Sequence, residues 1–415
     1  MSLAALSPAV RQYLLVTANY WAFTLTDGAL RMLVVLHFYS LGYSGLSIAM
    51  LFLFYEIFGV ITNLVGGWLG ARIGLNNTMN IGLFLQIVAL SMLLLPAAYL
   101  VVPWVMAAQA LSGIAKDLNK MSAKSSIKML VATEAQGTLF KWVALLTGSK
   151  NALKGLGFFI GGLLLSLIGF QLAILAMAGA LVLVWTLSLI KLKQDLGKST
   201  ARPKFSEMLS KSRAINILSA ARMLLFGARD VWFVIALPLF LASTLGWDHW
   251  TVGGFLALWV IGYGAVQSIA PLLLGKNTLP DGKTVTLWAL VLCVIPGLIA
   301  LALSANWQIE LALSAGLMLF GVVFAINSAV HSYLIVSYAR SDGVSMDVGF
   351  YYMANAMGRL LGTVLSGWLY QTAGLASCLW VSTAMLVLTV FISAMLPAIG
   401  ETATADNNKN NPPSK

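Results

Sequence analysis

Charged residues are scarce in this chain of 415 residues. Asp, Glu, Lys and Arg make up only 9% of the sequence, whereas apolar residues make up 60% and the mean hydropathy is +0.88. A soluble domain carries about 25% charged residues, so this composition excludes a soluble globular fold. The sequence is that of an integral membrane protein.

Cysteine and recognisable catalytic motifs are also lacking. Only Cys293 and Cys378 occur, and both lie inside apolar runs, which is typical of small core residues and not of a disulfide or a metal site. The sequence has no Walker-type phosphate loop, no Gly-x-Ser-x-Gly elbow and no intramembrane His/Glu metal pattern. A membrane-embedded enzyme is therefore disfavoured, and no cofactor or metal is expected.

What the chain does contain is a series of apolar runs of about 20 residues, the length that a helix needs to cross a bilayer. The predicted spans are 13–36, 45–69, 78–100, 102–127, 138–167, 170–190, 214–242, 250–274, 284–303, 307–338, 346–370 and 375–398. The predicted fold is an all-α membrane protein with twelve transmembrane helices in two six-helix halves. The predicted domains are an N-terminal half (1–190), a basic linker (191–213), a C-terminal half (214–399) and a polar tail (400–415).

Basic residues fall on alternate connections between these spans. They include Arg72, Lys128, Lys276, Lys283 and Arg340, whereas the intervening connections contain no Lys or Arg. By the positive-inside rule, the basic connections and both termini are expected in the cytoplasm. This topology accounts for much of the net charge of +11, so nucleic-acid binding is not expected.

The two halves resemble each other weakly. "KNALKGLGFFIGG" in the fifth span parallels "ANAMGRLLGTVLSG" in the eleventh, which gives Asn151 and Asn355 related positions. The stretch "GGWLGARIGLNN" resembles the loop signature of the major facilitator superfamily, whose binding site lies between two six-helix halves. Arg72 and Gly74 fit that signature, but Ala71 stands where the acid is expected.

Charges inside the predicted spans indicate function, because a Lys or Arg at mid-bilayer costs about 2.5–3.5 kcal/mol to insert. The candidates for substrate binding are Arg31, Lys116, Lys150, Asn151, Lys154, Arg229, Asn355 and Arg359. The candidates for coupling or gating are Asp27, Glu56, Asp117, Asp230 and His331. The cations outnumber the acids. A cavity with an excess of positive charge is unfavourable when it is empty and favourable when an anion fills it.

Spacing suggests how some of these charges are used. Asp27 is expected to neutralise Arg31 four residues later, and Asp230 the adjacent Arg229, either as structural or gating pairs or as part of the binding site. Lys150 and Lys154 share one helical face, which we interpret as a substrate contact.

Four further side chains have open or structural interpretations. Lys120, Lys124 and Lys128 are interpreted as snorkelling or positive-inside residues at a cytoplasmic helix end. His331 fits a proton relay or a neutral, hydrogen-bonded histidine equally well.

Several longer strings carry a more specific resemblance. "NYWAFTLTDGALRMLVVLHF", "AKDLNKMSAKSS", "SKNALKG" and "FGARDVWFVIALP" resemble the ArsJ family of organoarsenical efflux permeases within the major facilitator superfamily. The resemblance implies export of 1-arseno-3-phosphoglycerate, which forms when a glyceraldehyde-3-phosphate dehydrogenase uses arsenate in place of phosphate. It implies arsenate resistance, a bacterial inner-membrane location and a functional pairing with that dehydrogenase. We expect a monomer.

The implied substrate has an anionic group at each end. The Lys150/Lys154 face and the Arg229/Arg359 pair lie in opposite halves, so each suits one end. A carrier of ordinary phosphorylated metabolites would use the same cations and is the nearest alternative. A drug or lipid exporter is disfavoured, since it calls for an acidic and aromatic cavity. A pump for trivalent arsenic is disfavoured by the lack of clustered thiols.

Overall fold

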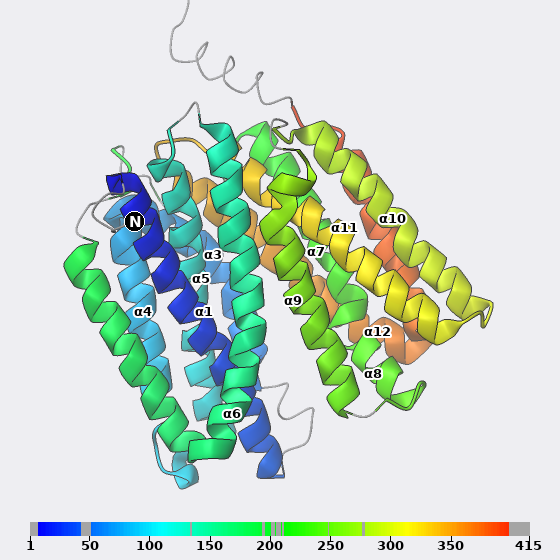
Figure 1. Ribbon diagram of the computed structural model, residues 1–415, viewed down its shortest axis with the longest axis horizontal. Coiled ribbons are helices and arrows are strands. Elements are labelled where there is room, and N and C mark those ends of the chain that lie inside the picture. The colour runs from blue at the N-terminus through cyan, green and yellow to red at the C-terminus, as the bar shows by residue number, and fades with distance from the viewer. Residues whose placement is uncertain are drawn as a thin grey trace, which may run out of the picture. The chain divides into compact units, whose positions relative to one another are not determined.

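The chain is almost entirely helical in the computed structural model, as the sequence predicts (Figure 1). The model describes residues 7–42, 51–132, 135–192, 196–200, 204, 209, 211–247, 249–275 and 279–397. The start of the second predicted span, parts of the predicted linker and the polar tail 400–415 lie outside these residues. The helices are α1 (Pro8–Ser40), α3 (Leu53–Ile73), α4 (Leu75–Met92), η2 (Ala97–Tyr99), α5 (Val102–Leu130), α6 (Gln136–Lys191), α7 (Arg213–Phe233), α8 (Ala236–Ser243), α9 (His249–Leu273), α10 (Gly282–Ser304), α11 (Ile309–Tyr338) and α12 (Val344–Ser393).

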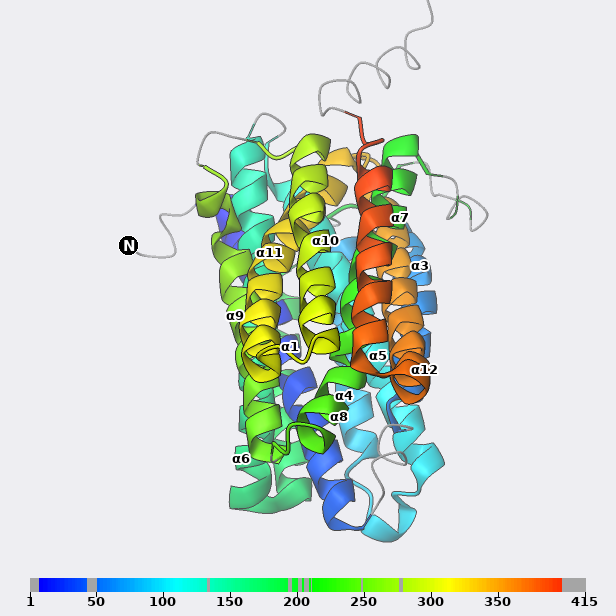
Figure 2. The ribbon, with the colours of Figure 1, turned by 90° about the vertical axis from the view of Figure 1, so that its right-hand side faces the viewer.

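Helices α6 and α12 each contain two predicted spans. Their 56 and 50 residues would extend about 75–85 Å if straight, more than twice the thickness of the hydrocarbon layer. Each is broken at one glycine, Gly169 (φ 76°, ψ 174°) and Gly374 (φ 74°, ψ −178°), in a conformation that is essentially restricted to glycine. The chain reverses there, as the two arms of α12 show in Figure 2.

The seventh predicted span is also interrupted. It consists of α7 and α8, separated at Val234 and Ile235. Pro238 lies two residues inside α8, so its missing N–H removes the helical hydrogen bond to the carbonyl of Val234 and its ring crowds that carbonyl. With α7 and α8 counted as one and the arms of α6 and α12 counted separately, the described residues contain a helix for each of the twelve predicted spans.

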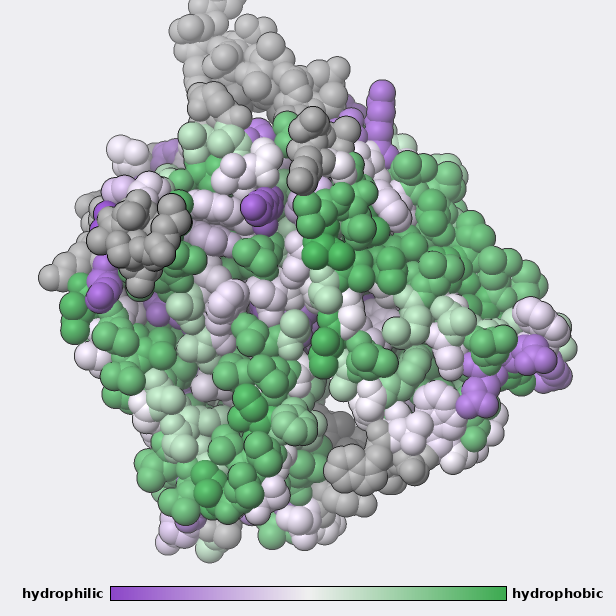
Figure 3. Space-filling view, in the orientation of Figure 1, coloured by the Kyte–Doolittle hydropathy of each residue, from purple (hydrophilic) through white to green (hydrophobic). Residues whose placement is uncertain are grey.

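Seven of the described helical segments are long and apolar enough to cross a membrane, including the double-length α6 and α12. The outward side chains fit that setting, because apolar surface covers much of the face in Figure 3. On α10, exposed apolar side chains recur every three or four residues along one stripe, which is the pattern of a lipid-facing helix. These side chains are Leu287, Leu290, Val294, Leu298 and Leu301.

The chain forms two compact units. Unit 1 comprises residues 1–209 and 340–353, and unit 2 comprises residues 210–339 and 354–415, so α12 begins in unit 1 and continues in unit 2. In unit 1, α1 packs along α6 and α5 packs against α3 and α4. In unit 2, α11 packs between α9 and α10.

Small residues allow the close helix contacts of unit 1. A Cβ atom on Gly28 of α1 would lie 2.8 Å from the carbonyl oxygen of Lys154 on α6, and one on Gly157 would lie 2.7 Å from that of Leu25. Helices that associate in lipid commonly meet through such small residues. The packing of α1 on α6 therefore holds Lys154 and its neighbours beside the first span.

The turn between α3 and α4 is the segment that resembles the superfamily's loop signature. Gly74 has φ 93°, which favours glycine. The N–H of Ser199 donates to the carbonyl oxygen of Ala71 at 2.7 Å, and the N–H of Leu75 donates to that of Leu196 at 2.8 Å. Residues 196–200 are thus held on this turn by backbone hydrogen bonds. One of these bonds is made to Ala71, the residue that stands where the signature has an acid.

Candidate substrate-binding site

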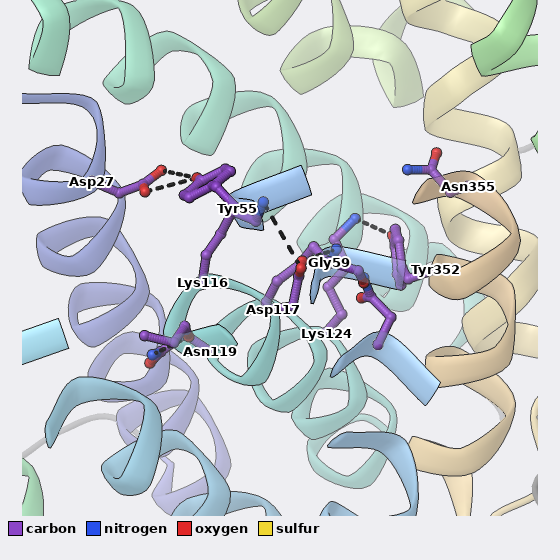
Figure 4. Close-up of polar contacts among 12 residues, drawn as sticks. Asp27, Tyr55, Gly59, Lys116, Asp117, Asn119, Lys124, Tyr352 and Asn355 are labelled. Atoms are coloured by element: carbon purple, nitrogen blue, oxygen red, sulfur yellow. Dashed lines mark hydrogen bonds and ion pairs between the residues drawn. The ribbon is translucent and has the colours of Figure 1, made fainter. Parts of the chain in front are cut away.

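A buried carboxylate on α5 is held by two lysines of the same helix. Asp117 is 1% exposed, with its Oδ1 2.6 Å from the Nζ of Lys120 and its Oδ2 3.8 Å from the Nζ of Lys116 (Figure 4). The ammonium of Lys116 also lies 3.8 Å from the centroid of the Tyr55 ring, a cation–π distance. The two lysines and Asp117 together carry one net positive charge. We call these three residues the Asp117 cluster.

The expected pairing of Asp27 with Arg31 is wrong. The hydroxyl of Tyr55 donates to both carboxylate oxygens of Asp27, at 2.8 and 3.0 Å. Arg31 instead reaches Glu56, 3.4 Å away, and its guanidinium lies 4.6 Å from the Tyr55 ring centroid. Spacing along α1 permits the first pairing, but α3 supplies a phenol for the acid and a carboxylate for the arginine.

The interpretation of Lys120 and Lys124 as snorkelling residues is also wrong. Lys120 is bound to Asp117, and Lys124 is only 3% exposed and donates to the hydroxyl of Tyr352 on α12. The ammonium groups of both lysines lie 4.7 Å from the Tyr352 ring centroid. A snorkelling lysine extends to water, whereas these two turn toward a buried aromatic side chain. The sequence gives no signal for Tyr352, which lies within an apolar run.

Unit 2 contains a similar arrangement around Asp230. This carboxylate is 0% exposed, with one oxygen 2.5 Å from Nη2 of Arg229 and the other 3.1 Å from Nε of Arg359. The expected pair of Arg229 with Asp230 is confirmed, and Arg359 from α12 is its second partner. We call these three residues the Asp230 cluster, which also carries one net positive charge.

The approach of α12 to α7 makes the Asp230 cluster possible. A Cβ atom on Gly362 would lie 2.6 Å from the carbonyl oxygen of Gly227 and 3.0 Å from Cβ of Asp230. The guanidinium of Arg229 is flanked by the rings of Phe226 and Phe324, at 4.8 and 5.5 Å from their centroids. These rings restrict where the planar guanidinium can turn.

Asn355 and Arg222 form a second polar group in unit 2. Nε of Arg222 donates to Oδ1 of Asn355 at 2.9 Å, and its Nη1 donates to Oγ of Ser328 at 3.0 Å. Sequence reasoning missed the side chains of Tyr263 and Gln267, which also donate to Ser328. A glutamine inside the apolar run "YGAVQSIAPLLL" is the signal that identifies this group in retrospect.

The lysine face of the fifth span lies on the first arm of α6. Lys150 and Lys154 are both half-buried. The ammonium of Lys150 donates to Oδ1 of Asn151 at 3.3 Å, and that of Lys154 lies 5.9 Å from the centroid of the Phe158 ring. The role of this face in substrate binding stays a prediction.

His331 on α11 is fully buried. Neither ring nitrogen has a hydrogen-bond partner among the residues that the structure describes, so the interpretation as a hydrogen-bonded histidine has no support. The described residues contain no group of three or more His, Cys, Asp or Glu side chains suited to a metal ion.

Comparisons with known proteins assign the family. The sequence profile of the Major Facilitator Superfamily matches residues 13–341, most of the chain. The chain therefore belongs to the major facilitator superfamily, whose members carry small solutes across membranes. No curated protein sequence matches it.

Solved structures share the fold at low sequence identity. The human organic anion transporter MFSD10 is 14% identical, with 94% of this chain and 100% of that chain covered and a TM-score of 0.74. The fucose:proton symporter of E. coli is 12% identical, with 94% and 100% covered and a TM-score of 0.73. A bacterial homologue of the iron transporter ferroportin is 16% identical, with 94% and 99% covered and a TM-score of 0.74.

Proposed function

We propose that this transporter exports a small anionic substrate, the phosphorylated organoarsenical 1-arseno-3-phosphoglycerate, and so confers arsenate resistance. The observation that carries the proposal is the presence, in each unit, of a buried carboxylate between two cations. Asp117 lies between Lys116 and Lys120, and Asp230 between Arg229 and Arg359. Each cluster retains one net positive charge where water is scarce, which favours an incoming anion.

The two clusters suggest how an anion exchanges with protein groups. A phosphate or arsenate oxygen that approaches Arg359, the most exposed member of the Asp230 cluster at 32%, competes with Asp230 for its guanidinium. The planar guanidinium suits the geometry of such oxyanions, and the competition allows release as well as binding. We propose Lys150, Lys154, Asn151, Asn355 and Arg31 as further contacts to the substrate, and Asp27, Glu56 and His331 as coupling or gating groups.

Proteins with this fold include an organic anion transporter, a sugar symporter and a homologue of an iron transporter, so the fold does not determine the substrate. The choice of substrate therefore rests on the ArsJ resemblance and on the charge of the clusters. We propose a monomer in the bacterial inner membrane with both termini in the cytoplasm. The substrate would come from a dehydrogenase that forms the arseno-ester. A carrier of ordinary phosphorylated metabolites is the second candidate, since the same clusters suit a phosphate.

The test uses cells that lack arsenic efflux and express this protein, the dehydrogenase, both or neither. Only cells with both proteins should gain arsenate resistance, and none should gain arsenite resistance. Lys150→Gln and Arg359→Gln should abolish the gain while the protein stays in the membrane. Lys283→Gln, which removes an exposed lysine near the start of α10, is the matched control and should leave resistance unchanged.

Two results would contradict the proposal. Arsenite resistance from this protein alone would identify a direct arsenic pump. Export of 3-phosphoglycerate without any change in arsenate sensitivity would favour the second candidate.

A further inference from the structure

Helix α11 carries a polar stretch, 327–332 ("NSAVHS"), in the interior of unit 2. The side chains of Asn327, Ser328, His331 and Ser332 are all 0% exposed. Both amide atoms of Asn327, both ring nitrogens of His331 and the hydroxyl of Ser332 have no hydrogen-bond partner among the described residues. Buried polar groups in a membrane helix are normally satisfied, so this stretch requires an explanation.

Ser328, in contrast, has too many donors. Its Oγ lies 3.0 Å from Nη1 of Arg222 on α7, 3.0 Å from the hydroxyl of Tyr263 and 3.1 Å from Nε2 of Gln267, both on α9. A hydroxyl oxygen has two lone pairs, so it cannot accept three good hydrogen bonds at once. Three donors from two helices therefore converge on one neutral hydroxyl oxygen, and Nη1 of Arg222 also lies 3.4 Å from the carbonyl oxygen of Ser328.

The position of the Arg222 donor is fixed by other contacts. Nε of Arg222 donates to Oδ1 of Asn355, and the guanidinium carbon lies 3.9 Å from the centroid of the Phe226 ring. These two contacts help to hold the arginine with Nη1 directed at Ser328. Such prior orientation lowers the entropy lost when a ligand binds.

An oxyanion matches this set of donors better than a hydroxyl does. A phosphate, arsenate or carboxylate oxygen offers more lone pairs and a negative charge, which roughly doubles the strength of each hydrogen bond. His331 lies one turn from Asn327 on α11, and both side chains are fully buried. Their polar atoms have no hydrogen-bond partner among the described residues and are available to further oxygens of such an anion.

We propose that Arg222, Tyr263 and Gln267 form an oxyanion-binding subsite within unit 2, in which a ligand oxygen competes with Oγ of Ser328 for the three donors. The subsite is distinct from the Asp230 cluster, because it contains no carboxylate among its converging groups. The inference deepens the proposed function, on which it rests: it assigns residues to one phosphate-like end of the substrate.

Thermal unfolding of the purified full chain in detergent tests the subsite, with inorganic phosphate as the probe and chloride at equal ionic strength as the reference. Phosphate should raise the unfolding temperature of the wild type, and Arg222→Gln should abolish that rise. Tyr263→Phe should weaken the apparent affinity for phosphate about tenfold, the effect of one hydrogen bond to a charged ligand. The control is Ser382→Ala, which removes another buried hydroxyl of unit 2, bonded to the carbonyl oxygen of Ala228.

Ser328→Ala separates a binding subsite from a structural tie between helices. It should lower the unfolding temperature without phosphate, because three donors lose the hydroxyl acceptor that they share, yet the rise caused by phosphate should be kept or enlarged. Loss of that rise in Ser328→Ala, its persistence in Arg222→Gln, or its absence in the wild type would each overturn the subsite. If Arg222→Gln does not fold, Gln267→Leu replaces it, with the same expected loss.

The arsenate assay distinguishes this inference from the proposed function. Arg222-dependent phosphate binding in a protein that confers no arsenate resistance would reject the function and leave the subsite intact. Resistance in a protein that binds phosphate equally well with and without Arg222 would reject only the subsite.

Discussion

Asp230 offers the sharpest test of the charge argument, since it is fully buried between two arginines. Asp230→Asn keeps the size of the side chain and removes its charge, so the cluster goes from one net positive charge to two. At the 3.1 Å that separates Asp230 from Arg359, two unit charges attract by about 5 kcal/mol at an effective dielectric constant of about 20. Removing one partner of a buried pair costs about 3–5 kcal/mol, and the partial exposure of Arg359 places the expected loss at the lower end, about 3 kcal/mol.

The assay is unfolding of the purified protein followed by tryptophan fluorescence. Asp230→Asn should unfold several degrees below the wild type. The double variant Asp230→Asn/Arg359→Gln returns the cluster to one net positive charge and should recover part of the loss. The matched control, Glu310→Gln, replaces an exposed carboxylate that accepts a hydrogen bond from Trp247 and should change little. If Asp230→Asn unfolds at the temperature of that control, the carboxylate does not neutralise the arginines and the reasoning fails.

Two other predictions concern packing and orientation. Gly349→Ala should destabilise the protein by about 1–3 kcal/mol, because its Cβ would lie 2.5 Å from the carbonyl oxygen of Asn63. Gly367→Ala on the same helix meets only the end of the Ile235 side chain at 3.5 Å, and equal stability of the two variants would refute the argument. A reporter active only in the cytoplasm should be active when fused after Lys198 or Lys415 and silent at Asp248; the reverse pattern would overturn the proposed orientation.

Much of the fold can be predicted from the sequence, because lipid leaves few choices. A spanning segment must satisfy its backbone within a helix of about 20 residues, so apolar length alone marks the spans. The breaks at Gly169 and Gly374 fall between predicted spans for the same reason. The break before α8 was not predicted, although Pro238 provides the signal for it.

The site is less predictable, because spacing along one helix fixes a face and not the partner that meets it. Arg229 and Asp230 are adjacent, and their pairing could be predicted. Asp27 and Arg31 have suitable spacing, but Tyr55 and Glu56 arrive from α3 and separate them. Such contacts depend on packing between helices, which the sequence pattern does not encode locally.

The two glycines that reverse the chain also bear on its origin. Gly169 (φ 76°, ψ 174°) and Gly374 (φ 74°, ψ −178°) adopt nearly the same backbone conformation at the same point of each half, between its fifth and sixth spans. Around them, "LSLIGFQLA" and "YQTAGLASC" have no other residue in common at matching positions. An ancestral half that was copied and fused would leave this trace, because side chains facing lipid can be exchanged freely while a turn accessible only to an achiral residue cannot. The backbone conformation of these two turns therefore preserves more evidence of a duplication than the amino-acid sequence around them does.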